Sequence, residues 1–399
     1  MPSVGANLSR QQDTFFTLSE FAPMKKQIAL TVLAGLAACS QERSVTGPPA
    51  ARAVALAASV QAVDGAQRAV YTLMNQVSGN AVAIFQRAAD GTLTAVGTVA
   101  TGGTGTGSGL GSQGALALSD DGRWLFAVNA GSNDVSILRV TPAGLVLTSR
   151  VPSGGTLPIS LTVHGNLLYV LNGGGSGNIA GFALDNGGGA TSIPGAIRPL
   201  SGPNVGPAEV AFSPNGRWLI VTEKNTNAFD IYAVGPDGVA GAPTLEASAG
   251  IQPFGFTFGL RNELFITEAA SGSVSSYVIG SSGTPVLVSG AVPTDQAAPC
   301  WAAVTKDGRF VYTANAHAGT ISGFAVGTDG TLRALDANGV TATVGAGNLD
   351  LAISENGRYL YQLRGNGPIT ALRVEDDGHL TILGVVGAMP GSVAGLAAR

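Results

Sequence analysis

The 399-residue sequence has little cysteine, histidine or charge, with two cysteines, three histidines and 12% charged residues. Two cysteines cannot build the disulfide framework that stabilises many small exported domains, so a large hydrophobic core must stabilise the fold. The histidines are scattered, no two cysteines are neighbours, and no calcium-binding loop motif occurs. We therefore expect neither a metal site nor a cofactor.

Basic clusters and long apolar runs are also missing. The formal net charge is -4, and the lysines and arginines are not interleaved with aromatic residues along any segment. A nucleic-acid partner needs a basic surface and is not expected. No apolar run gives a comfortable transmembrane helix of ~20 residues, so we expect membrane contact only through an N-terminal anchor. We also expect a monomer.

An export signal is predicted at residues 24–38. Met24 is followed by two lysines and then by the apolar run QIALTVLAGLAA, which ends in small residues. The sequence LAAC at residues 36–39 resembles the lipobox of bacterial lipoproteins, and this resemblance implies that Cys39 is acylated. The alternative is an ordinary secretory signal in which Cys39 is incidental. Both interpretations predict export to the cell envelope or periplasm.

Composition divides the chain into four parts. Residues 1–23 precede the signal and indicate an extension from an upstream start codon, or a longer signal. Residues 39–68 are rich in Ala, Pro, Val and Ser, as is typical of a tether. From Ala69 to Arg399, apolar runs of about four to eight residues alternate with Gly, Asn, Asp and Pro clusters. This pattern predicts an all-β domain of strands and tight turns at residues 69–399.

One phrase returns along this domain. It reads SDDGRWLFAVNAGSNDVS from Ser119, SPNGRWLIVTEKNTNAFD from Ser213, TKDGRFVYTANAHAGTIS from Thr305 and SENGRYLYQLRGNGPIT from Ser354. Prolines expected to open the innermost strands follow one another at 49, 46 and 46 residues, at Pro158, Pro207, Pro253 and Pro299. Units of about 47 residues have the length of a four-stranded propeller blade, and seven of them fill residues 69–399. The sequence therefore predicts a seven-bladed β-propeller.

The two ends of the domain predict how the ring closes. The first unit begins with AVYTL at Ala69 and lacks an innermost strand, whereas the chain ends in a spare strand-like SVAGLAA. Pairing of these segments in one blade would remove an open sheet edge.

Each repeated phrase is interpreted as the hairpin between the first and second strands of a blade. Its Asp-Gly or Asn-Gly pair supplies the positive φ angles that such turns need. The aromatic residue after Gly-Arg recurs at one register and is predicted to pack between adjacent blades; the four examples are Trp124, Trp218, Phe310 and Tyr359.

The segments GRWLFAVNAGSNDVSILRV and GRFVYTANAHAGTISGFAVGTDGTL resemble the seven-bladed lactonase propellers. That family includes 6-phosphogluconolactonase-like and carboxymuconate-cyclase-like proteins and grades into YVTN-type surface repeats. The resemblance implies a pocket at one mouth of the ring, with histidine, arginine and glutamate near the starts of inner strands, often as Pro-His or Arg-His. The matching positions hold no histidine here; they are Pro158-Ile159, Pro207-Ala208, Pro253-Phe254, Pro299-Cys300 and Gly347-Asn348.

The loops before each first strand and after each second strand share one face, which we call the mouth. There we predict that Glu223 or Glu268 acts as a base and that Arg364 holds an oxyanion. His317 is the only histidine predicted at the mouth and is a further catalytic candidate. Other mouth residues, which give it an acidic lean, are Asn129, Asn172, Glu209, Asn315 and Asp350. The alternative is that these side chains cap turns and bond neighbouring blades.

Two functions remain open from the sequence. One is hydrolysis of a small lactone at the mouth; the other is a non-catalytic envelope propeller that binds a protein, a glycan or a small molecule. Convergence of Glu223, Glu268, His317 and Arg364 on one pocket would favour catalysis. The glycine-rich run GGTGTGSGLGSQG, residues 102–114, is expected to be a flexible loop, with a lid over the mouth as one role for it.

Overall fold

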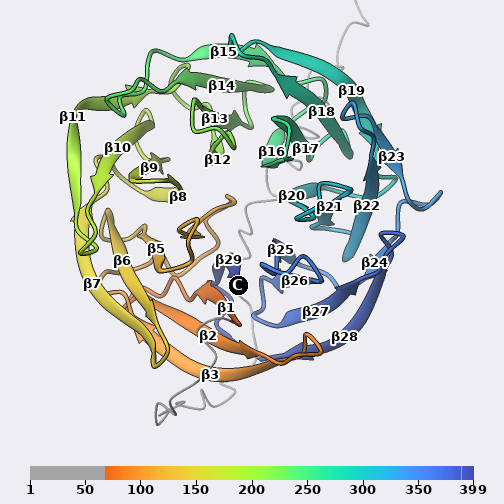
Figure 1. The fold of residues 1–399 in the computed structure, drawn as a ribbon, viewed down its shortest axis with the longest axis horizontal. Helices are drawn as coiled ribbons and strands as arrows, with labels where there is room; N and C mark the ends of the chain where they lie inside the picture. Colours follow the sequence, from red (N-terminus) through yellow and green to blue (C-terminus); the bar gives the residue numbers. More distant parts are fainter. Residues whose placement is uncertain (1–67, 388) are drawn as a thin grey trace, which may run out of the picture.

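The computed structural model describes residues 68–387 and 389–399 as a ring of seven antiparallel sheets (Figure 1). Blade 1 contains β29 (Ala394–Ala398), β1 (Ala69–Leu73), β2 (Ala81–Arg87) and β3 (Leu93–Ala100). Blade 2 contains β4 (Leu116–Leu118), β5 (Trp124–Asn129), β6 (Asp134–Thr141) and β7 (Gly144–Pro152). Blade 3 contains β8 (Pro158–His164), β9 (Leu167–Asn172), β10 (Asn178–Leu184) and β11 (Ala190–Pro199).

The remaining blades repeat the order from the innermost to the outermost strand. Blade 4 contains β12 (Pro207–Phe212), β13 (Trp218–Glu223), β14 (Ala228–Ala233) and β15 (Thr244–Ala247). Blade 5 contains β16 (Pro253–Phe258), β17 (Glu263–Glu268), β18 (Ser273–Ile279) and β19 (Pro285–Pro293). Blade 6 contains β20 (Pro299–Val304), β21 (Phe310–Asn315) and β22 (Thr320–Val326), with β23 (Leu332–Ala334) and β24 (Ala342–Thr343) both on β22. Blade 7 contains β25 (Asn348–Ile353), β26 (Tyr359–Arg364), β27 (Ile369–Val374) and β28 (Leu380–Val386).

The predicted all-β, seven-bladed fold and its closure are confirmed. The last strand, β29, pairs antiparallel with β1, so that Ala398 lies opposite Val70. The Thr72 hydroxyl also donates to the Gly395 carbonyl over 2.7 Å. The described residues contain no helix. The predicted extension, export signal, Cys39 and nearly all of the tether lie outside the described residues.

The repeated aromatic residues pack between blades, as predicted. Trp124 of blade 2 lies under Gly188 of blade 3, so close that a β-carbon at Gly188 would overlap the indole ring. The same contact recurs around the ring, as Gly283 over Trp218, Gly378 over Phe310 and Gly91 over Tyr359. Each pair joins a blade to the next, so these aromatic residues contribute to packing between blades.

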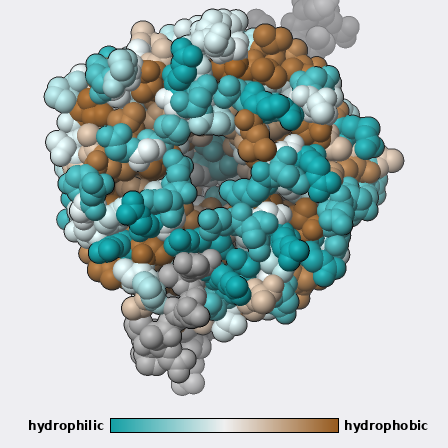
Figure 2. Space-filling view, viewed as in Figure 1, coloured by the Kyte–Doolittle hydropathy of each residue, from teal (hydrophilic) through white to brown (hydrophobic). Residues whose placement is uncertain are grey.

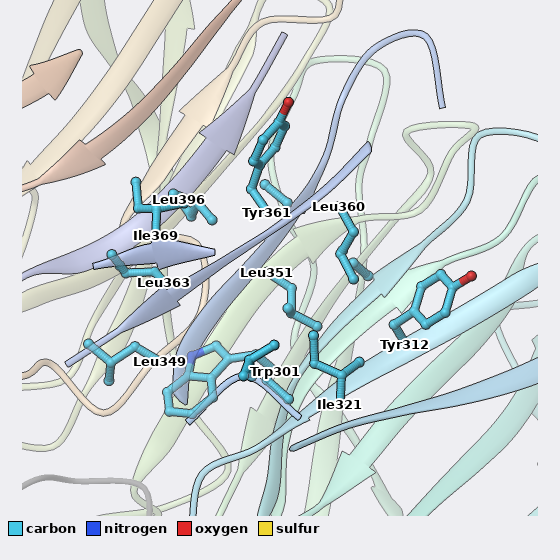
Figure 3. Close-up of a cluster of buried hydrophobic side chains, with 14 of the residues drawn as sticks. Trp301, Tyr312, Ile321, Leu349, Leu351, Leu360, Tyr361, Leu363, Ile369 and Leu396 are labelled. Carbon is cyan, nitrogen blue, oxygen red and sulfur yellow. The ribbon is translucent and has the colours of Figure 1, made fainter. Parts of the chain in front are cut away.

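The core lies between the blades. Its largest cluster extends across blades 4 to 7 and blade 1, with Trp301, Tyr312 and Tyr361 among its buried side chains (Figure 3). Burial of each large apolar side chain contributes roughly 2 kcal/mol, so a core of this size is a major source of stability.

The mouth loops reach the innermost strands through residues in a left-handed conformation. Leu157, Gln252 and Ala298 each precede an innermost proline and have φ of 55, 63 and 58°. Gly206 and Gly347 hold the same place in blades 4 and 7, with φ of 63 and 83°. Such a turn at each site redirects the chain from the outer rim to the central channel.

Candidate functional site

The mouth is the face formed by two sets of loops. The loops after the second strands are residues 74–80, 130–133, 173–177, 224–227, 269–272, 316–319 and 365–368. The loops before the innermost strands are residues 101–115, 153–157, 248–252, 294–298 and 344–347, together with 200–206, 387 and 389–393. Figure 2 shows one face of the ring, which is hollowed near its centre where the innermost strands meet.

Five of the predicted site residues occupy the same repeat position. Each is the last residue of the second strand in blades 2 to 6 and is fully buried; they are Asn129, Asn172, Glu223, Glu268 and Asn315. The Asn129 amide donates to Asp134 and Ser136 on the next strand, at 2.6 and 2.7 Å. Asn315 donates in the same way to Thr320 and Ser322. This position therefore joins the second strand to the third within a blade.

Glu268 has the same role, with a carboxylate in place of the amide. Its oxygens accept hydrogen bonds from the Ser273 and Ser275 hydroxyls, both at 2.6 Å. They also accept from the Ser248 hydroxyl and the Gly250 amide. Four donors satisfy the buried carboxylate, so the structure gives Glu268 a complete set of structural contacts.

Glu223 is held by a similar network in blade 4. Its carboxylate accepts from the Ser201 amide, the Ser201 hydroxyl and the Thr226 hydroxyl. The neighbouring Asp230 also accepts from the Ser201 amide, so two buried carboxyl groups share one donor. Burial and then the charge of Glu223 raise the pKa of Asp230 to about 8.

Arg364 breaks the repeat in blade 7. It ends the second strand there, but Pro368 lies where the other blades carry a residue of the third strand, and Arg364 donates only its backbone amide to it. The Arg364 side chain is partly buried beside Gly345, and its Nε is buried without a hydrogen-bond partner. Among the described residues, no hydrogen bond or ion pair to this side chain is found.

His317 lies on the neighbouring mouth loop and is exposed. Its backbone amide donates to Ala297, but no side-chain contact is found for it within the described part of the chain. The loops of His317 and Arg364 are joined through Gly347, which donates to the Ala316 carbonyl and accepts from the Gly365 amide. His317 and Arg364 therefore lie on connected loops. No hydrogen bond or ion pair between described residues joins any two of the four predicted catalytic residues.

Four of the carboxyl groups expected at the mouth are buried. Glu209, Glu223, Glu268 and Asp350 are between 0 and 6% exposed. Glu209 and Asp350 lie on the innermost strands, where they accept backbone amides of Phe256 and Leu351. Burial raises the pKa of Asp350 to about 8 and that of Glu209 well above its usual range. Sequence position alone did not show that these carboxyl groups point away from solvent.

Lys224 was not among the predicted catalytic residues, although its position after a second strand places it at the mouth. Its Nζ donates to the Gly111 carbonyl over 2.8 Å and lies 5.0 Å from the centre of the Phe254 ring. Burial lowers the pKa of Lys224 to about 8. The sequence signal was a single lysine in an otherwise uncharged loop, which does not tell where its long side chain reaches.

The glycine-rich segment Gly102–Gly114 does not extend over the mouth as a lid. Its last residues enter the central channel, where Gln113 contacts blades 4, 5 and 6 and Ser112 contacts blades 3 and 6. The segment that was expected to be a flexible loop and a lid therefore reaches the innermost strands of blades 3 to 6.

Two further features of the described residues bear on the site. No group of three or more His, Cys, Asp or Glu side chains within residues 68–387 and 389–399 is arranged to hold a metal ion. A search of the same residues for a helix of membrane-spanning length and apolarity finds none.

The sequence was compared with models of known protein families and with curated proteins. A family model described as Lactonase, 7-bladed beta-propeller matches residues 61–193 and 259–348, which together make up more than half of the chain. No curated protein matches the sequence.

Solved structures with the same fold are similar over most of the chain. A putative 6-phosphogluconolactonase from Bacteroides fragilis is 17% identical, with a TM-score of 0.67 and coverage of 84% of this chain and 98% of its own. The periplasmic gluconolactonase PpgL of Pseudomonas aeruginosa is 17% identical, with a TM-score of 0.66 and coverage of 82 and 98%. A protein from Lactobacillus plantarum is 16% identical, with a TM-score of 0.68 and coverage of 84 and 99%. Identities this low support the fold alone.

Proposed function

Because the chain belongs to the lactonase family of seven-bladed β-propellers, we propose that it is an exported enzyme that hydrolyses a small lactone at its mouth. The observation that carries the proposal is Arg364, whose guanidinium replaces the locally bonded Asn or Glu of five other blades and has no partner within blade 7. An unpaired, partly buried cation at the mouth of the propeller can stabilise an oxygen atom that gains negative charge during a reaction.

Arg364 and His317 divide the chemistry between them. Arg364 donates hydrogen bonds to the carbonyl oxygen of the lactone, and these bonds strengthen as a water oxygen attacks the carbonyl carbon. His317 removes a proton from that water. The bond between the carbonyl carbon and the ring oxygen then breaks, and the imidazolium returns its proton to the leaving oxygen. The product is an open hydroxy acid, which releases one proton at neutral pH.

The names of similar proteins support a lactone as the substrate class. Two of the solved structures are called a putative 6-phosphogluconolactonase and a periplasmic gluconolactonase. Export is supported by the basic and apolar residues 24–38, and anchoring by the lipobox-like ending at Cys39. Glu223 and Glu268 are assigned no catalytic step, because their buried oxygens are already used by neighbouring donors.

Proton release in a pH-stat tests the proposal against a panel of aliphatic, sugar and aromatic-derived lactones. Removal of the Arg364 guanidinium in Arg364→Met should lower kcat/KM by about 100-fold or more, the usual effect of losing an oxyanion donor. His317→Ala should lower kcat by a similar factor. The matched control is Arg333→Met on the short outer strand β23, which should leave turnover unchanged.

The competing function is a propeller that binds an envelope ligand without catalysis. It is favoured by the structural bonding of Glu223 and Glu268 and by the absence of histidine from the innermost-strand positions that the family uses. If a folded, monodisperse sample opens no lactone in the panel, this second function replaces the first. Calorimetric titration with lactones, sugars and envelope proteins would then identify the ligand.

A further inference from the structure

We infer that the glycine-rich segment Gly102–Gly114 is the floor of the mouth, and that it limits the depth of the ligand site and so the length of ligand accepted. The part about ligand length rests on the proposed function. The part about the floor does not, because it concerns access to the channel whether or not the protein is an enzyme.

The first half of the segment is fixed to the rim of the mouth. The Asn75 side chain accepts from the Thr106 amide over 3.1 Å and donates to the Ser108 carbonyl over 2.6 Å. On the neighbouring loop, the Gly131 amide donates to Thr104 over 3.0 Å. Blades 1 and 2 therefore hold residues 104–108 before the chain turns toward the centre.

The second half crosses the channel to the opposite blades. The Gln113 amide donates to Ala208 of blade 4 over 3.1 Å, and the Gln113 side chain donates to Phe256 and Ala302 of blades 5 and 6, at 3.2 and 3.0 Å. Ser112 donates to Ile159 of blade 3 over 2.7 Å. One short stretch thus bonds to the innermost strands of four consecutive blades.

A missing side chain explains why Gln113 fits there. Inner strands expose backbone amides to the channel, and a side chain of the preceding blade accepts them: Ser160 accepts from Val210 over 3.1 Å, and Glu209 accepts from Phe256 over 2.7 Å. The next member of this series is Gly255, which has no side chain to offer. A β-carbon there would overlap the Gln113 side chain.

Gln113 takes the place that Gly255 leaves open. Its Oε1 accepts the Ala302 amide over 2.9 Å, and so extends the series of side-chain acceptors from blades 4 and 5 to blade 6. An unpaired buried amide costs about 1–3 kcal/mol, so this bond from the Ala302 amide stabilises blade 6 as well as the segment.

Two side chains hold the floor from its edges. Lys224 donates to the Gly111 carbonyl over 2.8 Å from the mouth loop of blade 4. Trp301 donates its indole N–H to the Ser112 carbonyl over 3.0 Å and is 2% exposed. Phe254 packs against the Trp301 ring at 5.2 Å between centroids. These contacts fix the backbone of Gly111 and Ser112 at the channel, where we infer that it meets an entering ligand.

Trp301 provides a direct readout of the floor. In a background of Trp124→Phe and Trp218→Phe, Trp301 is the single tryptophan, and acrylamide quenching of its fluorescence measures access to the channel. Gln113→Ala should raise the quenching constant several-fold, because the side chain that fills the space at Gly255 is lost. The matched control is Gln296→Ala, which removes another mouth glutamine that donates to two carbonyls, but on the outer rim.

Lys224→Met provides a second route to the same test if Gln113→Ala does not fold. It removes the bond to Gly111 and the contact of the ammonium group with the Phe254 ring, and it should also raise the quenching constant. If the quenching constants of Gln113→Ala and Lys224→Met both equal those of the wild-type protein and Gln296→Ala, the inference that the segment forms a floor is wrong.

The limit on ligand length is tested by turnover. Gln113→Ala should raise kcat/KM for a lactone with an unbranched hexyl substituent relative to the unsubstituted ring, by about tenfold or more since even one misfitting methylene changes selectivity by about that factor. An unchanged ratio with increased quenching would overturn the length limit while the floor stands. A wild-type protein that opens no lactone would overturn the proposed function and the length limit that rests on it, but the quenching result would still decide the floor.

Discussion

Individual side chains at the mouth differ mainly in how many hydrogen bonds the surrounding structure gives them. Glu268 has four donors, whereas the Arg364 guanidinium has none among the described residues. Both end the second strand of a blade, so sequence position alone gives them equal weight. The difference arises beside the strand end, where Ser273 and Ser275 of the next strand donate to Glu268, whereas Pro368, which precedes the next strand in blade 7, accepts only the backbone amide of Arg364.

Buried carboxyl groups predict an unusual dependence of stability on pH. The folded-state pKa of Asp230 is raised to about 8, first by burial and then by Glu223. Between the unfolded pKa of about 4 and a pH of about 8, the folded state therefore binds one more proton than the unfolded state. This contribution to the free energy of unfolding is complete below about pH 4 and is lost as pH rises to about 8.

Asp230→Asn should remove this contribution. Denaturant unfolding at pH 4 to 8 should show a smaller loss of stability with rising pH in the variant than in the wild-type protein. Asp376→Asn, which changes an exposed carboxylate, is the control and should leave the slope as it was. A slope equal in all three proteins would contradict the assignment of a proton to the pair.

At the scale of elements, adjacent blades are joined by a hairpin glycine of one blade that packs over an aromatic residue of the preceding blade. Gly188 has φ of 86° and lies against Trp124 and Thr148. Gly195 has a similar φ of 75° but no atom within 4 Å of the place where a β-carbon would stand. The two glycines therefore separate the cost of backbone conformation from the cost of packing.

Gly188→Ala should be more destabilising than Gly195→Ala. The backbone term in each is about 1 kcal/mol, and the overlap with the indole should add about 1–3 kcal/mol at Gly188 alone. Urea unfolding of both variants gives the two values. Equal losses would show that the interface between blades 2 and 3 adapts to an added methyl group.

At the scale of the whole molecule, closure depends on the last strand. The chain returns to its starting blade, and β29 covers the edge of β1 that would otherwise be open. The Arg399 amide donates to Ala69 over 2.9 Å, so the strand is bonded to its end. Blades 1 and 7 also share the core cluster that contains Leu396 (Figure 3).

Removal of residues 392–399 should therefore destabilise the whole ring rather than one blade. The thermal unfolding temperature should fall, and the truncated protein should associate through the exposed β1 edge. A peptide of residues 389–399 added in trans should restore part of the loss, whereas a scrambled peptide should not. Unchanged unfolding and a monodisperse truncated sample would contradict closure as a source of stability.

The sequence by itself determined the ring, its seven blades and its closure. These follow from features that repeat in the chain: the turn glycines, the aromatic register and the spacing of Pro158, Pro207, Pro253 and Pro299. Repetition makes these features recognisable in the sequence, because every blade packs against its neighbour in the same way. The lactonase resemblance rests on the same repeats.

Only the tertiary structure decided what each mouth residue does. Whether a strand-end side chain is bonded depends on the strand beside it, and Gln113 fits because Gly255 of blade 5, distant in sequence, leaves a space. The glycine-rich segment has no periodic apolar pattern, so nothing in its own residues indicates that it enters the channel. A propeller brings the mouth ends of its innermost strands together at one axis, and contacts across that axis have no counterpart in the order of the chain.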